Sequence, residues 1–175
     1  MKTWWSAIDV ANSSYEEIKQ RKVISQGWHD LGPLNSLFPL INQDWKGFVT
    51  TIQIIGDTTY KGESWWNNDR NGNRTPKVMW NLLNIRSEDL IVAIEGTKVK
   101  GICEIEQDAI ETYIYQPKYE YAQTVGFPVE WIDWSEDKFS FIPTAPAQSV
   151  LGIAGLIGEH NEVVTAWQQY KSKAL

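Results

Sequence analysis

The sequence feature that most constrains the fold is a pair of short apolar runs separated by one glycine. Residues 90–94 (LIVAI) and 99–105 (VKGICEI) flank the turn Glu95-Gly96-Thr97. Glycine adopts positive φ at no steric cost, as a tight turn between two strands requires. Apolar and polar side chains largely alternate in the second run, which is typical of a strand. The two runs therefore predict a β-hairpin at the centre of a small sheet.

Tryptophan is unusually abundant in this chain. Ten of its 175 residues are tryptophan, and 42% are apolar, so one domain with a real core is expected. Each indole buries a large area and carries an N–H group that needs a partner. The surplus indicates either an aromatic-rich core or a surface that binds flat ligands, and we expect most of the indoles in the core.

The charge of the chain argues against non-specific binding of nucleic acid. The net charge is −6 and the pI is about 4.9, whereas proteins of that class carry a basic surplus. Residues 61–100 nevertheless contain seven basic and five acidic side chains, against two and nine in residues 101–138. This unevenness fits a basic face around the hairpin or ordinary surface patchiness, and the sequence leaves both alternatives open.

Cysteine content and hydropathy bear on the compartment. The single cysteine, Cys103, excludes an internal disulfide and lies among apolar residues, so we expect a buried hydrophobic side chain. The first residues have no continuous apolar stretch of the kind found in signal peptides, and no run reaches transmembrane length. These features predict a soluble protein of a reducing compartment.

Alternation and capping signals predict the elements before the hairpin. Residues 3–10 alternate as a first strand, and Ser14 with Glu17 has the spacing of a capping box. The capping box predicts a short helix over residues 15–22. Residues 45–56 fit a helix and a strand equally well.

A long loop is predicted over residues 56–77, which are polar, rich in glycine and asparagine, and aperiodic. Long loops in compact domains are commonly functional or disordered. Trp65 and Trp66 lie in the middle of this stretch. Two indoles in a polar loop either anchor it to the body of the protein or contact a ligand, and both alternatives stay open.

Two strands and a helical tail are expected after the hairpin. The strands are predicted over residues 111–121 and 125–134. Prolines then separate the sheet from a tail in which glycines favour two short helices, over residues 148–157 and 161–170. The order of elements predicts an α+β fold.

No catalytic constellation is evident in the sequence. His29 and His160 are the only histidines, and neither has neighbours at metal-ligand spacing. Phosphate-binding loops, GxSxG and CxxC are absent from the sequence. A carboxylate-only site is the remaining enzymatic alternative, drawn from Asp9, Asp30, Glu104 and Glu130. We therefore expect a protein without catalytic activity, cofactor or metal.

Aromatic residues at expected strand ends and loops indicate a site for a flat ligand. These residues are Trp5, Trp28, Trp65, Trp66, Trp80, Tyr121 and Trp131. A nucleobase stacked on an indole gains about 1–3 kcal/mol. Polar groups that a wrong base leaves unpaired would provide discrimination, and a base in a duplex must first be flipped out.

Several short pieces, in their order along the chain, resemble the EVE and YTH branch of the PUA superfamily. The resemblance is strongest to the N-terminal DNA-reading domains of McrB-type restriction proteins. The pieces are Trp4-Trp5-Ser6, Gly27-Trp28-His29-Asp30-Leu31-Gly32, Val78-Met79-Trp80, Asp89-Leu90-Ile91-Val92-Ala93, Gly96 with Lys98-Val99-Lys100-Gly101-Ile102-Cys103-Glu104, and Tyr121-Ala122-Gln123 with Pro128-Val129-Glu130-Trp131. They span about residues 3–135.

The resemblance implies a PUA/EVE-like domain over residues 1–142, with a helical C-terminal extension, residues 143–175, packed on it. The implied fold is a curved, barrel-like β-sheet flanked by short helices. The implied site is an aromatic pocket that takes a modified base, such as a methylated adenine or cytosine.

When the pocket residues of the family are transferred to the matching positions of this sequence, Trp28, Trp5 and Ser6 would line the pocket. Asp30 would form hydrogen bonds with the edge of the base. Further candidates are Trp80 and Tyr121, together with Trp65 and Trp66, whose loop could close over the ligand. Trp131 would belong to the core beneath the pocket.

Two features depart from the family pattern. Gln123 stands where the family often has a histidine, and no basic residues follow it. The whole chain is also acidic, whereas phosphate contacts supply much of the affinity for duplex DNA. These departures leave open a smaller ligand, namely a free modified nucleotide or a nucleotide messenger.

The resulting hypothesis is a non-catalytic reader of a modified base in DNA or RNA. The first alternative is a binding module or sponge for a free nucleotide in bacterial or phage defence. The second is an interaction or structural protein whose tryptophans belong to the core. The expected partners are the nucleic acid or nucleotide, and either a second copy of the chain or a nuclease or motor subunit. No membrane partner is expected, and the resemblance implies the cytoplasm of a prokaryotic or phage-infected cell.

Overall fold

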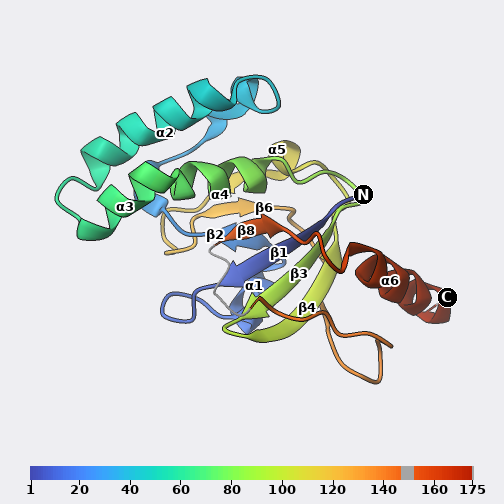
Figure 1. Cartoon of the computed structure of the whole chain (residues 1–175). Coiled ribbons are helices and arrows are strands. Elements are labelled where there is room, and N and C mark those ends of the chain that lie inside the picture. The colour runs from blue at the N-terminus through green and yellow to red at the C-terminus, as the bar shows by residue number, and fades with distance from the viewer. Residues whose placement is uncertain (147–151, 175) are drawn as a thin grey trace.

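The computed structural model describes residues 1–146 and 152–174. It confirms the predicted hairpin, because β3 (Leu90–Glu95) and β4 (Lys98–Glu104) pair antiparallel and Gly96 in the turn has a φ of 63°. This hairpin belongs to a five-stranded sheet with the order β7-β4-β3-β1-β8 (Figure 1). The other strands of this sheet are β1 (Thr3–Ile8), β7 (Ile132–Asp133) and β8 (Ile153–Gly155).

Strand β1 lies between two segments that follow it at long distances in the sequence. It pairs parallel with β3, with Thr3 opposite Leu90, and antiparallel with β8, with Trp4 opposite Gly155. Successive side chains of a strand point to opposite faces of the sheet. Trp4 and Trp5 therefore enter two different hydrophobic clusters, and both indoles are buried.

A second, three-stranded sheet has the order β2-β6-β5 and consists of β2 (Ile24–Gln26), β6 (Gln123–Val125) and β5 (Ile114–Tyr115). Helix α1 (Tyr15–Arg21) precedes it, and the predicted N-cap is confirmed, since the Ser14 side chain accepts a hydrogen bond from the Glu17 N–H at 3.2 Å. Among the described strands, the two sheets do not close into a barrel. The α+β class is thus confirmed.

Three hydrophobic clusters hold these layers together. The first lies between the two sheets and α1 and contains Trp4, Ile91 and Val125. The second lies on the opposite face of the five-stranded sheet, where helix α6 (His160–Ala174) packs through Val163 and Trp167. Figure 1 shows α6 at the end of the sheet remote from α2 and α3. The third cluster is the core of a separate helical lobe.

The helical lobe occupies the region where the sequence predicted a loop over residues 56–77, and that prediction is wrong. The lobe consists of the 3-10 helices η1 (His29–Leu31) and η2 (Asn35–Leu40) and the helices α2 (Trp45–Thr59), α3 (Ser64–Gly72) and α4 (Arg74–Leu83). Asn73, with a φ of 51°, joins α3 to α4. Helix α3 buries only Trp66 and Asp69, so it offers too few apolar residues to show helical periodicity.

Three other expectations need correction. The strand predicted over residues 125–134 is two strands in different sheets, because the chain turns at Gly126, whose φ is 77°. The strand predicted over residues 111–121 shrinks to the two residues of β5, after the short helix α5 (Ala109–Thr112).

The predicted helical tail is partly wrong. Residues 153–155 form the edge strand β8 instead of a helix, while α6 covers the second predicted helix. Residues 148–151 of the first predicted helix lie outside the described residues. No helix in the described chain has the length and apolarity needed to cross a bilayer.

Candidate functional site

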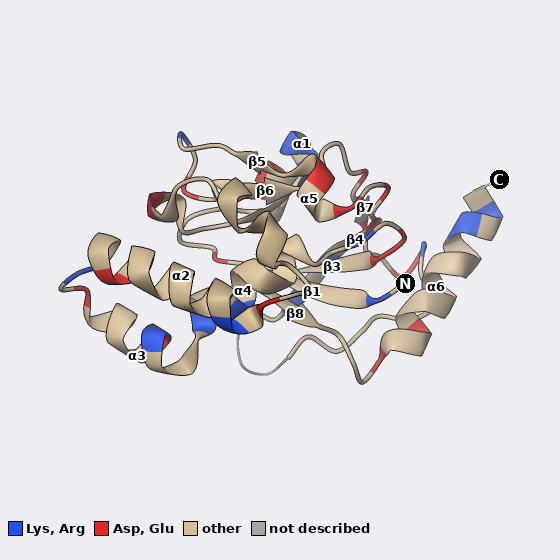
Figure 2. Ribbon diagram, turned by 90° about the horizontal axis from the view of Figure 1, so that it is seen from above, with Lys and Arg blue, Asp and Glu red and all other residues tan. Residues whose placement is uncertain are grey.

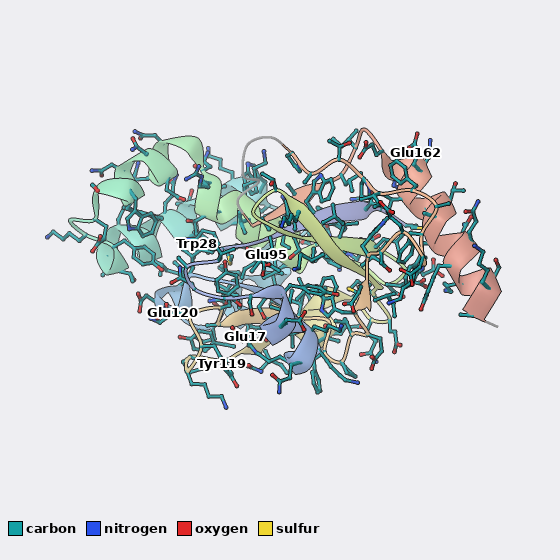
Figure 3. The ribbon with its side chains drawn as sticks, turned by 90° about the horizontal axis from the view of Figure 1, so that it is seen from below. Glu17, Trp28, Glu95, Tyr119, Glu120 and Glu162 are labelled. Atoms are coloured by element: carbon teal, nitrogen blue, oxygen red, sulfur yellow. The ribbon has the colours of Figure 1, made fainter. Side chains whose placement is uncertain are left out.

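A cavity of about 750 Å³ lies between the helical lobe and the ends of β1 and β2. Its volume falls within the range of about 300–1,000 Å³ that is usual for small-molecule sites. The lining comes from five segments that are distant in the sequence, namely residues 7–12, 26–30, 60–74, 94–96 and 120–121, together with Gly152. In Figure 3, Trp28 and Glu120 are labelled at this end of the molecule, beside the helices of the lobe.

Trp28 lines the cavity from a turn with an unusual backbone. It has φ 60° and ψ 46°, a left-handed conformation that is uncommon for a bulky residue and persists only where surrounding contacts fix it. Gln123, which is fully buried, donates from Nε2 to the carbonyl oxygens of Trp28 and Gly32, each at 3.1 Å. The Tyr115 hydroxyl donates to the His29 carbonyl at 2.7 Å. The second sheet therefore holds this turn in place.

Tyr60 and Trp65 form the aromatic wall on the side of the helical lobe. Their ring centroids are 4.9 Å apart, and the Trp65 side chain is 42% exposed at the rim. Trp66 lies behind this wall, where it is buried and donates from Nε1 to Asp57 at 2.9 Å. Of the two adjacent indoles, one is therefore available to a ligand and the other anchors the lobe.

Tyr121 closes the opposite side of the cavity. It is buried, and its hydroxyl accepts a hydrogen bond from the Asp9 N–H at 2.6 Å. Burial raises the pKa of Tyr121 to about 12, so the phenol is neutral across the physiological range. Aromatic groups thus face the cavity from three directions.

Gln26 provides an unpaired polar group in this wall. It is 2% exposed, yet its Nε2 atom has no hydrogen-bond partner among the described residues. Burying an amide without a partner costs about 1–3 kcal/mol. The hydroxyl groups of Ser6 and Ser25 nearby in the sheets are also buried without a described partner. Gln26 is thus a polar residue of the cavity wall whose Nε2 atom the described residues leave unpaired.

Charged groups around the cavity are mostly acidic. The carboxyl-bearing residues are Asp9, Asp30, Asp69 and Glu120, and the one guanidinium is that of Arg74. Asp69 is 3% exposed and accepts hydrogen bonds from the Thr75 N–H and Oγ1, at 3.1 and 2.8 Å. Burial raises the pKa of Asp69, although the hydrogen bonds from Thr75 and the charge of Arg74 oppose this.

His29 connects two of the carboxylates at the rim. Its Nε2 atom is 2.9 Å from Asp30 Oδ1, and its Nδ1 atom is 3.6 Å from Glu120 Oε2. Among the described residues, no group of three His, Cys, Asp or Glu side chains is arranged to hold a metal ion. The site therefore offers stacking surfaces, one buried amide and a negatively charged rim.

The structure brings four of the eight predicted site residues to the cavity. Trp28, Asp30, Trp65 and Tyr121 line it. Trp5, Ser6, Trp66 and Trp80 do not line it.

The four remaining residues lie in the cores or behind the cavity wall. Trp5 packs beneath α6 on the far face of the sheet, and Ser6 is buried within β1. Trp80 packs edge-on against Trp45 and Phe48, with centroid distances of 5.2 Å in both cases. Trp131 is in the core between the sheets, where its Nε1 donates to the Val23 carbonyl.

Sequence reasoning missed Gln26, Tyr60, Asp69 and Arg74. Gln26 directly precedes the Gly27-Trp28 pair, so its position beside the predicted pocket was available from the sequence. Tyr60, Asp69 and Arg74 lie in the stretch predicted as a loop. Tyr60 caps the C-terminus of α2, whereas Asp69 and Arg74 belong to α3 and α4, and the packing of these helices brings all three residues to the cavity.

No protein-family model, curated protein or solved structure matches this chain.

Proposed function

We propose that this chain is a non-catalytic binding protein that holds a modified, in the first instance methylated, base of nucleic acid in the aromatic cavity. The observation that carries the proposal is the combination of the half-buried Trp28 and the exposed Trp65 with the buried rings of Tyr60 and Tyr121 and the unpaired amide of Gln26. A base would stack on Trp28 and Trp65, and such stacking contributes about 1–3 kcal/mol per base. The amide would pair with the edge of the base and penalise bases that cannot match it.

The resemblance to the EVE and YTH branch supports the same assignment. Trp28 and Asp30, which line the cavity, come from one of the pieces that carry the resemblance. In a duplex the target base would be flipped into the cavity, at a cost that is lowest for a weakly paired base.

The test is a fluorescence titration with short oligonucleotides, plain and methylated, as single strands and duplexes. Binding of a base against Trp28 or Trp65 should quench indole emission. Trp65→Ala should weaken binding of the modified oligonucleotide about tenfold, which corresponds to 1.4 kcal/mol. Trp28→Ala should have an effect at least as large, provided that circular dichroism shows a folded protein.

Trp45→Ala is the matched control. The Trp45 side chain is 40% exposed, nearly the same as Trp65 at 42%, but it does not line the cavity. Affinity of the Trp45 variant should equal that of the parent. Equal affinity for the parent and a folded Trp28→Ala protein would eliminate the cavity as the binding site.

A free nucleotide is the second candidate ligand, and Arg74 favours it. Its guanidinium is exposed on the cavity lining, and no carboxylate of a described residue lies within salt-bridge distance of it. Figure 2 shows basic residues at the start of α4 and otherwise scattered over the ribbon in that view. One available guanidinium suits a single phosphate better than the repeated phosphates of a polymer.

Strand length discriminates between the two candidates. A reader of nucleic acid should bind an oligonucleotide more tightly than the matching mononucleotide, whereas a sponge for free nucleotides should not. In the second case Arg74→Gln should weaken the binding of a nucleoside monophosphate while leaving that of the nucleoside unchanged.

A further inference from the structure

The charge around the cavity is opposite to what a phosphate-rich ligand would favour. Four residues with carboxyl groups line the cavity, against one arginine and one histidine. Asp30 and Glu120 are exposed at the rim and share His29, so neither is neutralised by a lysine or arginine of the described chain. The electrostatic field at this opening is therefore attractive to a cation.

The aromatic lining favours the same sign of charge. A cation near the face of an indole or phenol ring is attracted by the negative electrostatic potential of the π-system, and tryptophan gives the strongest effect. Trp28, Tyr60, Trp65 and Tyr121 all line the cavity. A flat cation could thus stack on the rings while its charge faces the carboxylates.

The buried amide is independent support for a ligand at this position. Gln26 lines the cavity at 2% exposure, and its Nε2 atom has no partner in the described part of the chain. A carboxamide both donates and accepts hydrogen bonds. It can therefore pair with the exocyclic amino group or the ring nitrogen of a base, whichever edge is presented.

We propose that the base held in this cavity is cationic, that is, a base alkylated on a ring nitrogen such as 1-methyladenine or 3-methylcytosine. This inference rests on the proposed function and specifies its ligand. A neutral methylated base would gain only the stacking and hydrogen-bonding contributions, whereas a ring-alkylated base would also interact with the carboxylates and with the faces of the rings.

Positional isomers provide the test, because they have the same methyl content but different charge. 1-Methyladenosine and 3-methylcytidine are protonated at neutral pH, whereas N6-methyladenosine and 5-methylcytidine are neutral. Fluorescence titration of the full chain at pH 7 should show that the cationic member of at least one pair binds ten or more times as tightly as its neutral isomer. Raising the salt concentration should reduce this ratio, since exposed charges are screened.

Glu120→Gln removes one charge from the rim and should lower the preference for the cationic isomer about threefold or more. Glu162→Gln is the matched control, because it makes the same chemical change on the exposed first turn of α6. Figure 3 shows Glu162 at the opposite end of the molecule from Glu120. The control variant should keep the preference of the parent.

The outcomes separate this inference from the proposed function. Equal binding of both isomers, or tighter binding of a neutral isomer, would overturn the cationic ligand and leave the base-binding cavity in place. If Glu120→Gln and Glu162→Gln both lose the preference for the cationic isomer, the overall charge of the protein, and not the rim of the cavity, selects the ligand. That result would also overturn the inference of a cationic base. If no nucleoside or oligonucleotide binds, the proposed function fails and this inference fails with it.

Discussion

Replacement of Gln123 by leucine should destabilise the protein substantially, because it removes three hydrogen bonds of a fully buried side chain. The carboxamide is fully buried, accepts a hydrogen bond from the Tyr113 hydroxyl, and donates to the carbonyl oxygens of Trp28 and Gly32. Leucine has a similar size but can make none of these bonds. Gln123→Leu therefore removes the side chain that holds the left-handed turn at the cavity.

The magnitude follows from the groups left without partners. The Trp28 carbonyl keeps a bond from the Leu31 N–H at 3.1 Å. The Tyr113 hydroxyl still accepts from the Leu34 N–H at 2.9 Å, but it loses its acceptor. The Gly32 carbonyl loses the donor described for it. The Tyr113 hydroxyl and the Gly32 carbonyl belong to partly buried residues, and each costs about 1–3 kcal/mol when it is left without a partner, so a loss of roughly 3 kcal/mol is expected.

Urea and thermal unfolding would measure this loss. A protein of this length loses about 2–4 °C in Tm per kcal/mol, so Tm should fall by roughly 6–12 °C. Gln53→Leu is the control, because Gln53 also donates two hydrogen bonds, at 2.7 and 3.3 Å, but is only half-buried. Water can replace those bonds, and the control should lose less than about 1 kcal/mol. Equal losses for the two variants would refute the role assigned to the buried amide.

Three further outcomes are expected. Gly56→Ala should lower the free energy of unfolding by about 1–3 kcal/mol, because the added Cβ would lie 2.1 Å from the Trp66 ring. Gly72→Ala is the control: the space around Gly72 is open, so this variant should be neutral or slightly stabilising in the same urea titration. The hydrogen bond from Lys19 holds the pKa of Asp133 below its usual value. The ion pair therefore stabilises the folded protein above about pH 4, and this contribution is lost at lower pH. Asp133→Asn should make the free energy of unfolding less dependent on pH below about pH 4. Burial raises the pKa of the Cys103 thiol, so a disulfide reagent should label it only as the protein unfolds, and rapid labelling of the native state would contradict this.

The elements that sequence analysis predicted correctly are those with strong local signals. The hairpin follows from two β-type runs and a glycine that must adopt positive φ, and α1 follows from the hydroxyl of Ser14 at its N-cap. Both signals act within a few residues, so they do not depend on the rest of the fold.

The sequence pattern did not predict the elements whose conformation depends on tertiary contacts. Helix α3 is polar and buries Trp66 against Gly56 of α2, so its stability comes from packing rather than from periodicity. Strand β8 has only three residues, Ile153–Gly155, and is defined by pairing with β1. A short segment of this kind has no preference strong enough to fix its conformation alone.

The candidate site likewise combines residues that the sequence analysis expected there with residues that only tertiary packing brings to the cavity. Trp28, which the sequence analysis expected in the pocket, lines the cavity, while the wall formed by Tyr60 and Trp65 depends on where the helical lobe packs. Of the paired indoles Trp65 and Trp66, only the three-dimensional arrangement decides which one faces the cavity. Sequence analysis therefore predicted one side of the site and left the other undetermined.

The central position of β1 has a consequence for biosynthesis. Its partners Leu90 and Gly155 lie 87 and 151 residues after Thr3 and Trp4, respectively. At about 5–20 residues per second, a ribosome would need roughly 8–30 s to supply the second partner after β1 has been made. During that interval β1 lacks both of its partner strands, so its edges and the apolar surfaces of Trp4 and Trp5 stay exposed. The cavity, which begins where β1 ends and includes Gly152, can be completed only after most of the polypeptide has emerged.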